Sequence, residues 1–389
     1  MNVVAVSGSL CPYCENATAA GSFTDEHVWP QVFGGELAGA DFVIRICKRC
    51  NDLCGLFVDA EFEKSFFVSN RRGVAALAYL DLENGYPLPL AYFGVVQDID
   101  PAPYGTAEFW IAPCRSRILH LHDSAGEKFT GYAGGNPIAR KKKPGTAIFI
   151  NAAENEKQAR VDLRSFAQKF DKERRLVWGV SLSPDIAVSF EQKFGSEPTG
   201  ADDLFVQKFI ELERQPLRLG LSIRLDFEHR FMAKVALGLG YKLLGDDFLK
   251  SSWSRRLRET LWAQGQAQGQ LAPVGRGEIG RPKEDTLGDV LEWQGGVLLA
   301  VFPSQRNLVV AFNVFGARHE VVISDDPAFW GQVPDLMLGR VWVLIPQRKF
   351  CAGPISLNEF FRHKAGGSES PKLMEAESWR KEGRRSPDE

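Results

Sequence analysis

The fold at the N-terminal end is decided by residues 11–51, CPYCENATAAGSFTDEHVWPQVFGGELAGADFVIRICKRCN, which hold two Cys-x-x-Cys pairs. The four thiols belong to Cys11, Cys14, Cys47 and Cys50. Two such pairs supply the four thiolates of a tetrahedral structural zinc site, and their paired spacing is the specific part of the signal. The sequence therefore predicts a zinc site that joins both ends of this stretch.

Three side chains suited to catalysis lie inside the same stretch. Glu26 and His27 begin the run EHVWP, and Asn51 directly follows the second cysteine pair. Because zinc would draw the two ends together, we expect Glu26, His27 and Asn51 to share one small site. A carboxylate, an imidazole and a carboxamide beside a metal-held loop suggest metal-assisted cleavage of phosphodiester bonds.

The first cysteine pair also has a redox interpretation. Cys11-Pro12-Tyr13-Cys14 follows the apolar residues 3–6 and looks like the active site of a glutaredoxin. That interpretation requires a helix that continues from Cys14, whereas residues 15–21 have little apolar periodicity. It also leaves the second cysteine pair unexplained. We therefore favour zinc binding over redox chemistry.

In this order, the motifs resemble the HNH nuclease superfamily, specifically its members with a zinc-bound ββα-metal site. The resemblance covers roughly residues 8–68, less than a fifth of the chain. The matching positions are Cys11-x-x-Cys14, Glu26-His27-x-x-Pro30, Gly34-Gly35, Cys47-x-x-Cys50-Asn51, Gly55 and Val58-Asp59-Ala60.

The resemblance implies roles for individual residues. His27 matches the general base, and Glu26 and Asn51 match the ligands of a catalytic divalent metal, Mg²⁺ or Mn²⁺. The four cysteines match the ligands of the structural zinc. The resemblance further implies an endonuclease that hydrolyses phosphodiester bonds, with DNA as its nucleic-acid partner. A cutting module joined to an unassigned region is similar to the layout of host-defence or restriction nucleases in bacteria and phages.

The stretch departs from the family pattern at three positions. Many members have aspartate before the histidine, where this chain has the longer Glu26. The asparagine that usually orients the base is missing from residues 39–46, so we expect Asp41 or a backbone carbonyl to hold His27. The last histidine is also missing, and Asp59 is its nearest replacement, as a metal ligand, as a catalytic acid or as a carboxylate on the helix surface. The alternative function is therefore a catalytically decayed zinc protein that binds nucleic acid or acts as a scaffold.

The local pattern suits two strands followed by a helix. Residues 22–28 and 41–46 are predicted strands, and Gly34-Gly35 is predicted to form a turn between them. A helix is predicted from Asp52 onward, and Cys54 inside it is expected to be a buried core thiol. Mg²⁺ prefers oxygen ligands, so one carboxylate and one carboxamide suffice as protein ligands. A histidine with an ordinary pKa of about 6.5 can accept a proton from water at neutral pH.

The length of 389 residues suggests two or three domains in an α+β fold. We expect a ββα-metal HNH module with a zinc-ribbon-like four-cysteine site at residues 1–72, a larger mixed α/β-strand region of unassigned role at 73–363, and a disordered charged tail at 364–389. In the larger region, the pattern predicts strands within 74–150, helices within 151–263, an exposed linker at 265–284 and strands within 297–345.

Charge and cysteine use narrow the functional classes. The formal net charge of −2 excludes a chain coated with basic surface, so contact with nucleic acid is expected to be local. The candidate basic patches are Arg45/Lys48/Arg49, Arg71/Arg72, residues 140–143 and Arg255/Arg256/Arg258. The first of these is best placed because it flanks the proposed site. Cysteines used as metal pairs and single thiols fit a reducing, cytoplasmic location.

Other features of the chain carry less information. No apolar stretch approaches twenty residues, so no membrane span is predicted, and residues 1–4 lack the basic region of a signal peptide. His120 and His122 are predicted to face one side of a strand, and we interpret them as structural because no cysteine or acid lies nearby at a metal-site spacing. The sequence does not identify a protein partner or a signal ligand for the C-terminal region.

Overall fold

The computed structural model divides the chain into two compact units. Unit 1 combines Met1–Glu63 with Leu225–Glu389, and unit 2 is Lys64–Arg224. Helices and strands are mixed in both units, so the predicted α+β class is confirmed. The structure describes residues 9–18, 22–79, 88–100, 105–123, 145–178, 196–220, 226–263, 273–278, 286–367 and 370–382.

The N-terminal module has the predicted order of two strands and a helix. β3 (Phe23–His27) pairs antiparallel with β4 (Val43–Cys47), and α1 (Lys48–Cys54) follows at once. The helix starts at Lys48 rather than Asp52, so the second cysteine pair sits at its N-terminal end. It continues through the π-helical turn η4 (Gly55–Asp59) into α2 (Ala60–Glu63). The turn predicted between the strands is present, because Gly34 has a φ of 89° and ends η2 (Gln31–Phe33).

Unit 1 is completed by an antiparallel sheet from the C-terminal part of the chain. Its strand order is β11-β14-β13-β12-β15-β16. The bounds are β11 (Gly275–Arg276), β12 (Val297–Ser304), β13 (Asn307–Val314), β14 (Ala317–Ser324), β15 (Arg340–Ile345) and β16 (Phe350–Ser356). Four of these strands match the predicted ones. β16 was missed because Gly353 and Pro354 interrupt its apolar pattern.

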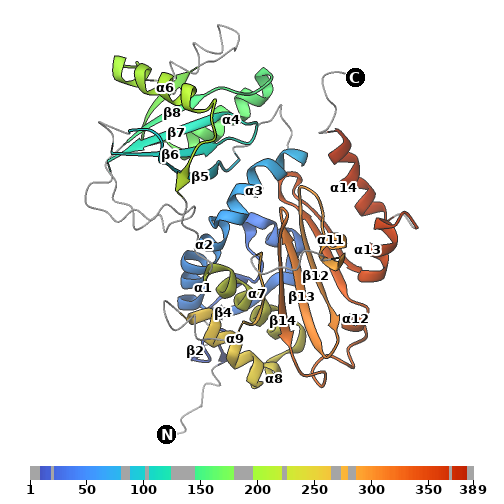
Figure 1. Ribbon diagram of the computed structural model, residues 1–389. Coiled ribbons are helices and arrows are strands. Elements are labelled where there is room, and N and C mark those ends of the chain that lie inside the picture. The colour runs from blue at the N-terminus through green and yellow to red at the C-terminus, as the bar shows by residue number, and fades with distance from the viewer. Residues whose placement is uncertain are drawn as a thin grey trace. The chain divides into compact units, whose positions relative to one another are not determined.

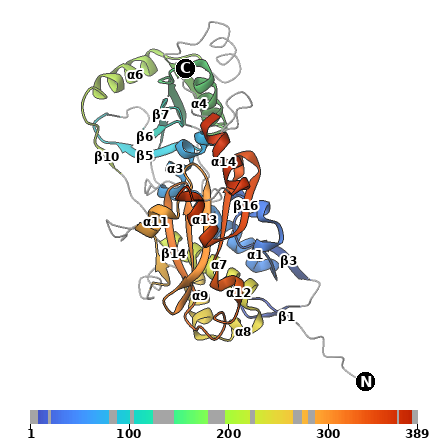
Figure 2. The same ribbon diagram turned by 90° about the vertical axis from the view of Figure 1, so that its right-hand side faces the viewer.

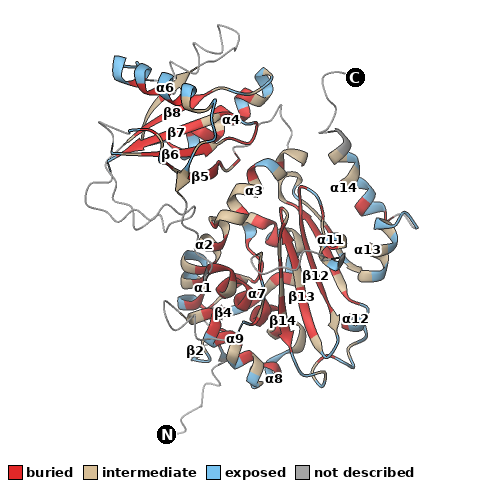
Figure 3. Cartoon of the chain, in the orientation of Figure 1, coloured by how far each residue is buried: buried red, intermediate tan, exposed pale blue. Residues whose placement is uncertain are grey.

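One long helix, α7 (Asp226–Leu244), contacts both the N-terminal module and the sheet. Its residues 230–240 are all buried, so this part of the helix has no face exposed to water. Figure 1 shows α7 between the blue N-terminal strands and the orange sheet, and Figure 3 shows its buried surface in red. A side chain at Gly238 would meet Val28 Cγ2 at 2.7 Å, so glycine permits the close approach of α7 to the segment after β3.

Aromatic side chains form the core that holds the module to the rest of unit 1. Phe62 of α2 stacks on Phe231 of α7 with ring centroids 3.7 Å apart. Trp29 packs edge-on against Phe231 and against Phe312 of β13, with centroid distances of 5.7 and 5.2 Å. Phe42 contacts Trp342 of β15. Because its large side chains find their partners more than 160 residues away, the module shares one core with the C-terminal half, and the division differs from the expected boundary at residue 72.

Shorter helices cover the remaining parts of unit 1. They are α8 (Asp246–Leu249), α9 (Ser252–Trp262), α11 (Thr286–Val290), α12 (Pro334–Met337), α13 (Leu357–Lys364) and α14 (Pro371–Glu382). Figure 2 shows α13 and α14 beside β16, which both helices contact. α14 lies in the tail that we expected to be disordered, and it is ordered because Leu373 and Ala376 are fully buried. Most of the expected linker at 265–284 lies outside the described residues.

Unit 2 is a six-stranded sheet of order β10-β5-β6-β7-β8-β9 with helices on it. The strands are β5 (Ala91–Val96), β6 (Thr106–Ile111), β7 (Arg117–His122), β8 (Thr146–Ile150), β9 (Arg174–Trp178) and β10 (Leu219–Gly220). The helices are α3 (Phe66–Ala76), α4 (Glu156–Lys169) and α6 (Gly200–Leu212). Separate apolar cores form with α6 and with α4. The predicted strands β5 to β8 and both longer helices are confirmed, whereas β9 was missed inside a region interpreted as helical.

Candidate functional site

The four predicted zinc ligands lie together at one end of the module. The hairpin of β1 (Ser9–Leu10) and β2 (Ala17–Thr18) carries the first cysteine pair, and the junction of β4 and α1 carries the second. The four Sγ atoms all lie within 4.8 Å of one another. Cys14 Sγ and Cys47 Sγ are 3.9 Å apart, close to the roughly 3.8 Å edge of a tetrahedron with Zn–S bonds of about 2.3 Å. We call this group the four-cysteine cluster.

One thiol of the four-cysteine cluster, that of Cys11, has an environment that favours the metal-binding thiolate form. A hydrogen bond from the Cys50 side chain and backbone N–H groups, including that of Cys47, lower the pKa of Cys11 to about 5. Thiolates rather than thiols bind metals, so this environment favours the ligand form. A bend at Glu15 and the strand β2 follow Cys14 in place of the helix that the redox interpretation requires. The geometry therefore supports metal binding over redox chemistry.

Helix α9, which follows α7 and α8 in the chain, contacts the segment that carries the first cysteine pair. Trp262 Nε1 donates to the Tyr13 carbonyl oxygen at 2.7 Å, and Arg258 forms a 2.6 Å ion pair with Glu15. Arg258 is buried and also donates to the Leu249 carbonyl oxygen. Arg258 therefore serves the fold, which removes it from the basic patch that we expected on α9.

His27 and Asn51 lie on neighbouring elements of the module. His27 ends β3, and its buried Nδ1 atom has no hydrogen-bond partner. Asn51 lies in the first turns of α1 and donates from Nδ2 to Thr24 Oγ1 and to the Asp25 carbonyl oxygen, both at 2.9 Å. These two bonds tie the start of the helix to β3 and fix the orientation of the carboxamide.

Asp41 does not hold His27 in this structure. Its Oδ2 atom accepts a hydrogen bond of 3.0 Å from Trp342 Nε1. The expectation that Asp41 orients the base is therefore wrong, and the unpartnered Nδ1 shows that no backbone carbonyl replaces it. Asp41 instead joins the module to β15, because a buried indole N–H requires an acceptor.

A lysine that the sequence analysis did not identify lies at the centre of the site. Lys234 of α7 is completely buried, and its Nζ atom is 2.7 Å from Glu26 Oε1. It lies 2.7 and 2.9 Å from the two carboxylate oxygens of Asp59 and donates to the His27 carbonyl oxygen at 3.1 Å. We call Lys234, Glu26 and Asp59 the ion cluster. The only signal in the sequence was a single lysine inside the apolar run of residues 231–239.

Lys234 keeps its charge despite its burial. Burial lowers the pKa of Lys234, but Asp59 and Glu26 raise it more, so the ammonium stays charged. Burial raises the pKa of Asp59 to about 6, against the opposing effect of Lys234. Asp59 is thus an ion-paired carboxylate facing α7, and the expected alternative of a carboxylate on the helix surface is wrong.

The family comparison agrees with this geometry. Residues 11–67 match the family model described as HNH endonuclease. The N-terminal segment is an HNH module. No curated protein and no solved structure matches the chain. The matched residues include the four-cysteine cluster, β3, β4 and α1, so the family match and the folded elements describe the same part of the HNH module.

Two basic residues of the HNH module, Arg45 and Lys48, have exposed side chains. The Arg45 side chain is 60% exposed and lies 3.5 Å from Asp25, and Lys48 is 72% exposed and paired with Asp52. Both side chains remain accessible to a polyanion. Residues 140–143, another candidate patch, lie outside the described residues.

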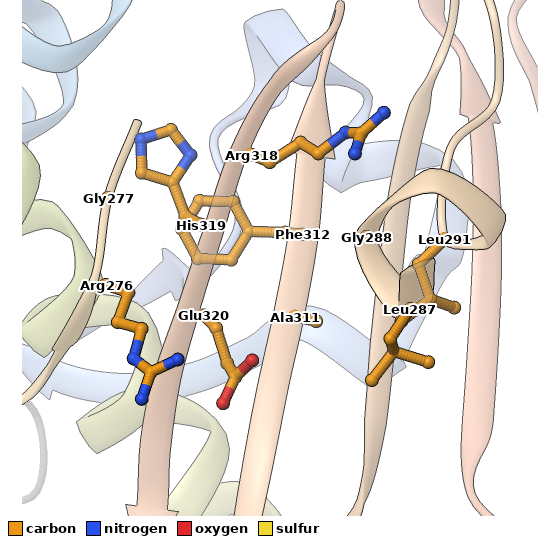
Figure 4. Close-up of a pocket in the computed structure, with 10 residues that line it drawn as sticks. All are labelled: Arg276, Gly277, Leu287, Gly288, Leu291, Ala311, Phe312, Arg318, His319 and Glu320. Atoms are coloured by element: carbon orange, nitrogen blue, oxygen red, sulfur yellow. The ribbon is translucent and has the colours of Figure 1, made fainter. Parts of the chain in front are cut away.

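A pocket on the sheet of unit 1 contains none of the candidate HNH residues. It is lined by Arg276, Gly277, Leu287, Gly288, Leu291, Ala311, Phe312, Arg318, His319 and Glu320. Figure 4 shows these residues, which lie on β11, α11, β13 and β14 or, for Gly277 and Leu291, directly after β11 and α11. His319 stacks on Phe312 with ring centroids 4.9 Å apart, so aromatic packing fills part of it. No helix of the described residues is long and apolar enough to cross a membrane.

His120 and His122 face the same side of β7, as predicted, but they are not alone. Glu108 of β6 lies opposite His120 in the strand register, and all three side chains are buried. Spacing along the chain does not reveal this acid, because antiparallel pairing of β6 and β7 is what brings residue 108 beside residue 120. The interpretation that no acid accompanies the two histidines is therefore wrong.

Proposed function

We propose that the HNH module is a metal-dependent endonuclease that hydrolyses phosphodiester bonds in DNA. The observation that carries this proposal is that His27 ends β3 and Asn51, in the first turn of α1, is hydrogen-bonded to β3, within residues that match the HNH family model. An imidazole and a carboxamide on neighbouring elements can act on one scissile phosphate, the imidazole as the general base and the carboxamide as a metal ligand.

The metals in this proposal have different ligand sets. The four-cysteine cluster suits zinc, because soft thiolates in tetrahedral positions prefer it. Glu26 and Asn51 are hard oxygen ligands, which suit Mg²⁺ or Mn²⁺. Glu26 can bind a metal while it is paired with Lys234, because a carboxylate has two oxygens with several lone pairs. One oxygen can face Lys234 while the other coordinates the metal. When bound, such a metal supplies charge stabilisation to the phosphate and the leaving oxygen.

His27 is the proposed general base. Its buried Nδ1 atom has no hydrogen-bond partner among the described residues, and the Lys234 ammonium donates to its backbone carbonyl, which fixes the end of β3. The imidazole would take a proton from the attacking water as the new phosphorus–oxygen bond forms. Asn51 would position the helix start through its bonds to Thr24 and Asp25.

Lys234 is the proposed positioning residue for Glu26. Its ammonium offsets the charge of two buried carboxylates that would otherwise repel one another and lose hydration. The same positive charge lies 2.7 Å from Glu26 and therefore opposes a second cation there. We expect a weak, millimolar-range requirement for divalent metal rather than a tightly held ion.

The Lys234–Glu26 ion pair also favours a second candidate function. If the ammonium permanently takes the place of a catalytic cation, the HNH module would bind nucleic acid without cutting it. Its four-cysteine cluster and exposed Arg45 and Lys48 would remain useful in such a binding protein or scaffold.

Incubation of the full-length protein with supercoiled plasmid separates the two functions. The endonuclease nicks or linearises the plasmid when Mg²⁺ or Mn²⁺ is added and stops when a chelator follows. A gel-shift experiment on the same samples measures binding. Binding without cleavage at every concentration of either metal would favour the non-catalytic candidate.

A further inference from the structure

Unit 2 contains a second group of metal-ligating side chains, far from the HNH motif in sequence. Glu108 lies on β6, and His120 and His122 lie on β7, to which β6 pairs antiparallel. The pairing sets Glu108 opposite His120, and His122 follows two positions later on the same face. We call these three residues the histidine cluster. Their side chains are 1%, 5% and 4% exposed, in that order.

The ligand atoms of the histidine cluster converge. One atom from each residue lies within 4.8 Å of the others. Glu108 Oε1 is 3.3 Å from His122 Nε2, which matches the roughly 3.3 Å between two ligands of a tetrahedral ion with bonds of about 2.0–2.1 Å. His120 Nδ1 is 3.0 Å from Glu108 Oε2. The two imidazole rings lie 4.8 Å apart between centroids.

The hydrogen bonds of Glu108 divide its two oxygens into separate roles. Oε2 lies within hydrogen-bond distance of Trp110 Nε1, at 3.3 Å, and of His120 Nδ1. Oε1 is buried and, among the residues that the structure describes, approaches only His122 Nε2, at 3.3 Å and without the geometry of a hydrogen bond. A buried carboxylate oxygen without a hydrogen bond is costly, and such atoms in native proteins call for an explanation. A bound cation supplies one.

The surroundings of the histidine cluster exclude water and supply a further acid. Phe170 packs on His120 with ring centroids 5.0 Å apart and belongs to the apolar core beneath α4. Glu173, just before β9, places Oε1 3.6 Å from His120 Nε2. Imidazole with carboxylate is a common ligand set for divalent transition metals, and outer acids orient the ligating histidines.

We propose that Glu108, His120 and His122 form a second metal site of the protein, which binds a divalent first-row transition ion such as Zn²⁺, with Glu173 as the fourth ligand or as the acid that orients His120. This site differs in kind from the four-cysteine cluster, because its ligands are nitrogen and oxygen rather than sulfur. A metal bound there would link β6 and β7 to the segment that leads into β9. It does not depend on nuclease activity.

Zinc analysis of the full-length protein tests the proposal. We expect two zinc equivalents per chain in the wild type and one in Glu108→Gln, which keeps the shape of the side chain but removes the anionic ligand. His319→Gln is the matched control, because His319 is also buried beside an acid, Glu228, but has no second histidine. This control should keep two equivalents. One equivalent in the wild type, or two in a folded Glu108→Gln protein, would overturn the proposal.

X-ray absorption at the zinc edge tests the wild type without any variant. Two occupied sites predict a mixed first shell, with nitrogen and oxygen neighbours near 2.0–2.1 Å and sulfur neighbours near about 2.3 Å. A shell of sulfur alone would show that only the four-cysteine cluster holds zinc. This measurement keeps the proposal testable even if Glu108→Gln fails to fold.

Discussion

The ion cluster of unit 1 and the histidine cluster of unit 2 balance buried carboxylates with different cations. In the ion cluster, the Lys234 ammonium is covalently part of the chain and stays charged between Glu26 and Asp59. In the histidine cluster, Glu108 faces two imidazoles. Burial lowers the pKa of His120, but hydrogen bonds with Glu108 and Glu173 raise it more, and an imidazole can release its proton to bind a metal. A fixed ammonium weakens the case for a tightly bound metal, whereas a pair of imidazoles strengthens it.

The two units also differ in how much core surrounds a metal site. The four-cysteine cluster sits among strands of two residues and the start of a short helix. The histidine cluster lies on a six-stranded sheet, on the face that packs against the apolar core beneath α4. Loss of metal should therefore cost unit 1 far more than unit 2, because small elements depend on the metal for folding.

The largest expected effect is that of Cys50→Ser. Structural zinc contributes about 10–16 kcal/mol to the folding of zinc-finger peptides, so this variant should lose one zinc equivalent and melt at a markedly lower temperature as the HNH module unfolds. Glu108→Gln should lose one equivalent with a much smaller change in melting temperature. Calorimetry with zinc analysis measures both. A Cys50→Ser protein that melts like the wild type would contradict the difference between the units.

The next largest effect is expected for Lys234→Met. The substitution keeps the aliphatic packing but leaves Glu26 and Asp59 buried without a cation, which should lower the free energy of unfolding by about 3–5 kcal/mol. Lys242→Met, near the exposed end of the same helix, is the matched control and should change it by less than about 1 kcal/mol. Denaturant titration measures the difference. Equal effects of the two substitutions would show that the ion cluster is not a stabilising centre.

These residues show what the sequence alone could reveal. The four cysteines, Glu26, His27 and Asn51 lie within one short stretch, and local spacing was enough to predict their strands, their helix and the clustering of the four cysteines. Lys234 lies 207 residues from His27 in the chain, and only the packing of α7 brings them together. Glu108 joins its histidines through strand register, which a single sequence does not specify.

A smaller effect concerns pH and belongs to Asp59. Its pKa of about 6 in the folded protein exceeds the value of 3.8 expected when it is unfolded, so the folded state binds more protons between these pH values. Through this group, the free energy of unfolding falls by about 1–3 kcal/mol as pH rises from roughly 4 to 6. Asp59→Asn should remove this part of the slope, and the exposed control Asp52→Asn should not. Parallel pH profiles for the wild type and Asp59→Asn would contradict the burial-driven shift.

The smallest expected effect concerns the exposed basic residues beside the second cysteine pair. Arg45→Ala and Lys48→Ala should each lower the slope of log affinity against log salt concentration by about 0.9 for every lost phosphate contact on duplex DNA. Lys250→Ala, an exposed lysine paired with Asp247 on α8, is the control. Binding measured at several salt concentrations gives the slopes. Unchanged slopes for Arg45→Ala and Lys48→Ala would move the DNA-binding surface elsewhere.

The most direct measurement is plasmid cleavage by full-length His27→Ala in the presence of Mg²⁺ or Mn²⁺. Loss of a general base should slow cleavage on the order of 10²–10⁴-fold, while zinc content and melting stay as in the wild type. His229→Ala, which changes a half-buried histidine of α7, is the matched control and should cleave normally. A folded His27→Ala protein that cleaves at the wild-type rate would contradict the assignment of the HNH module as the catalytic centre.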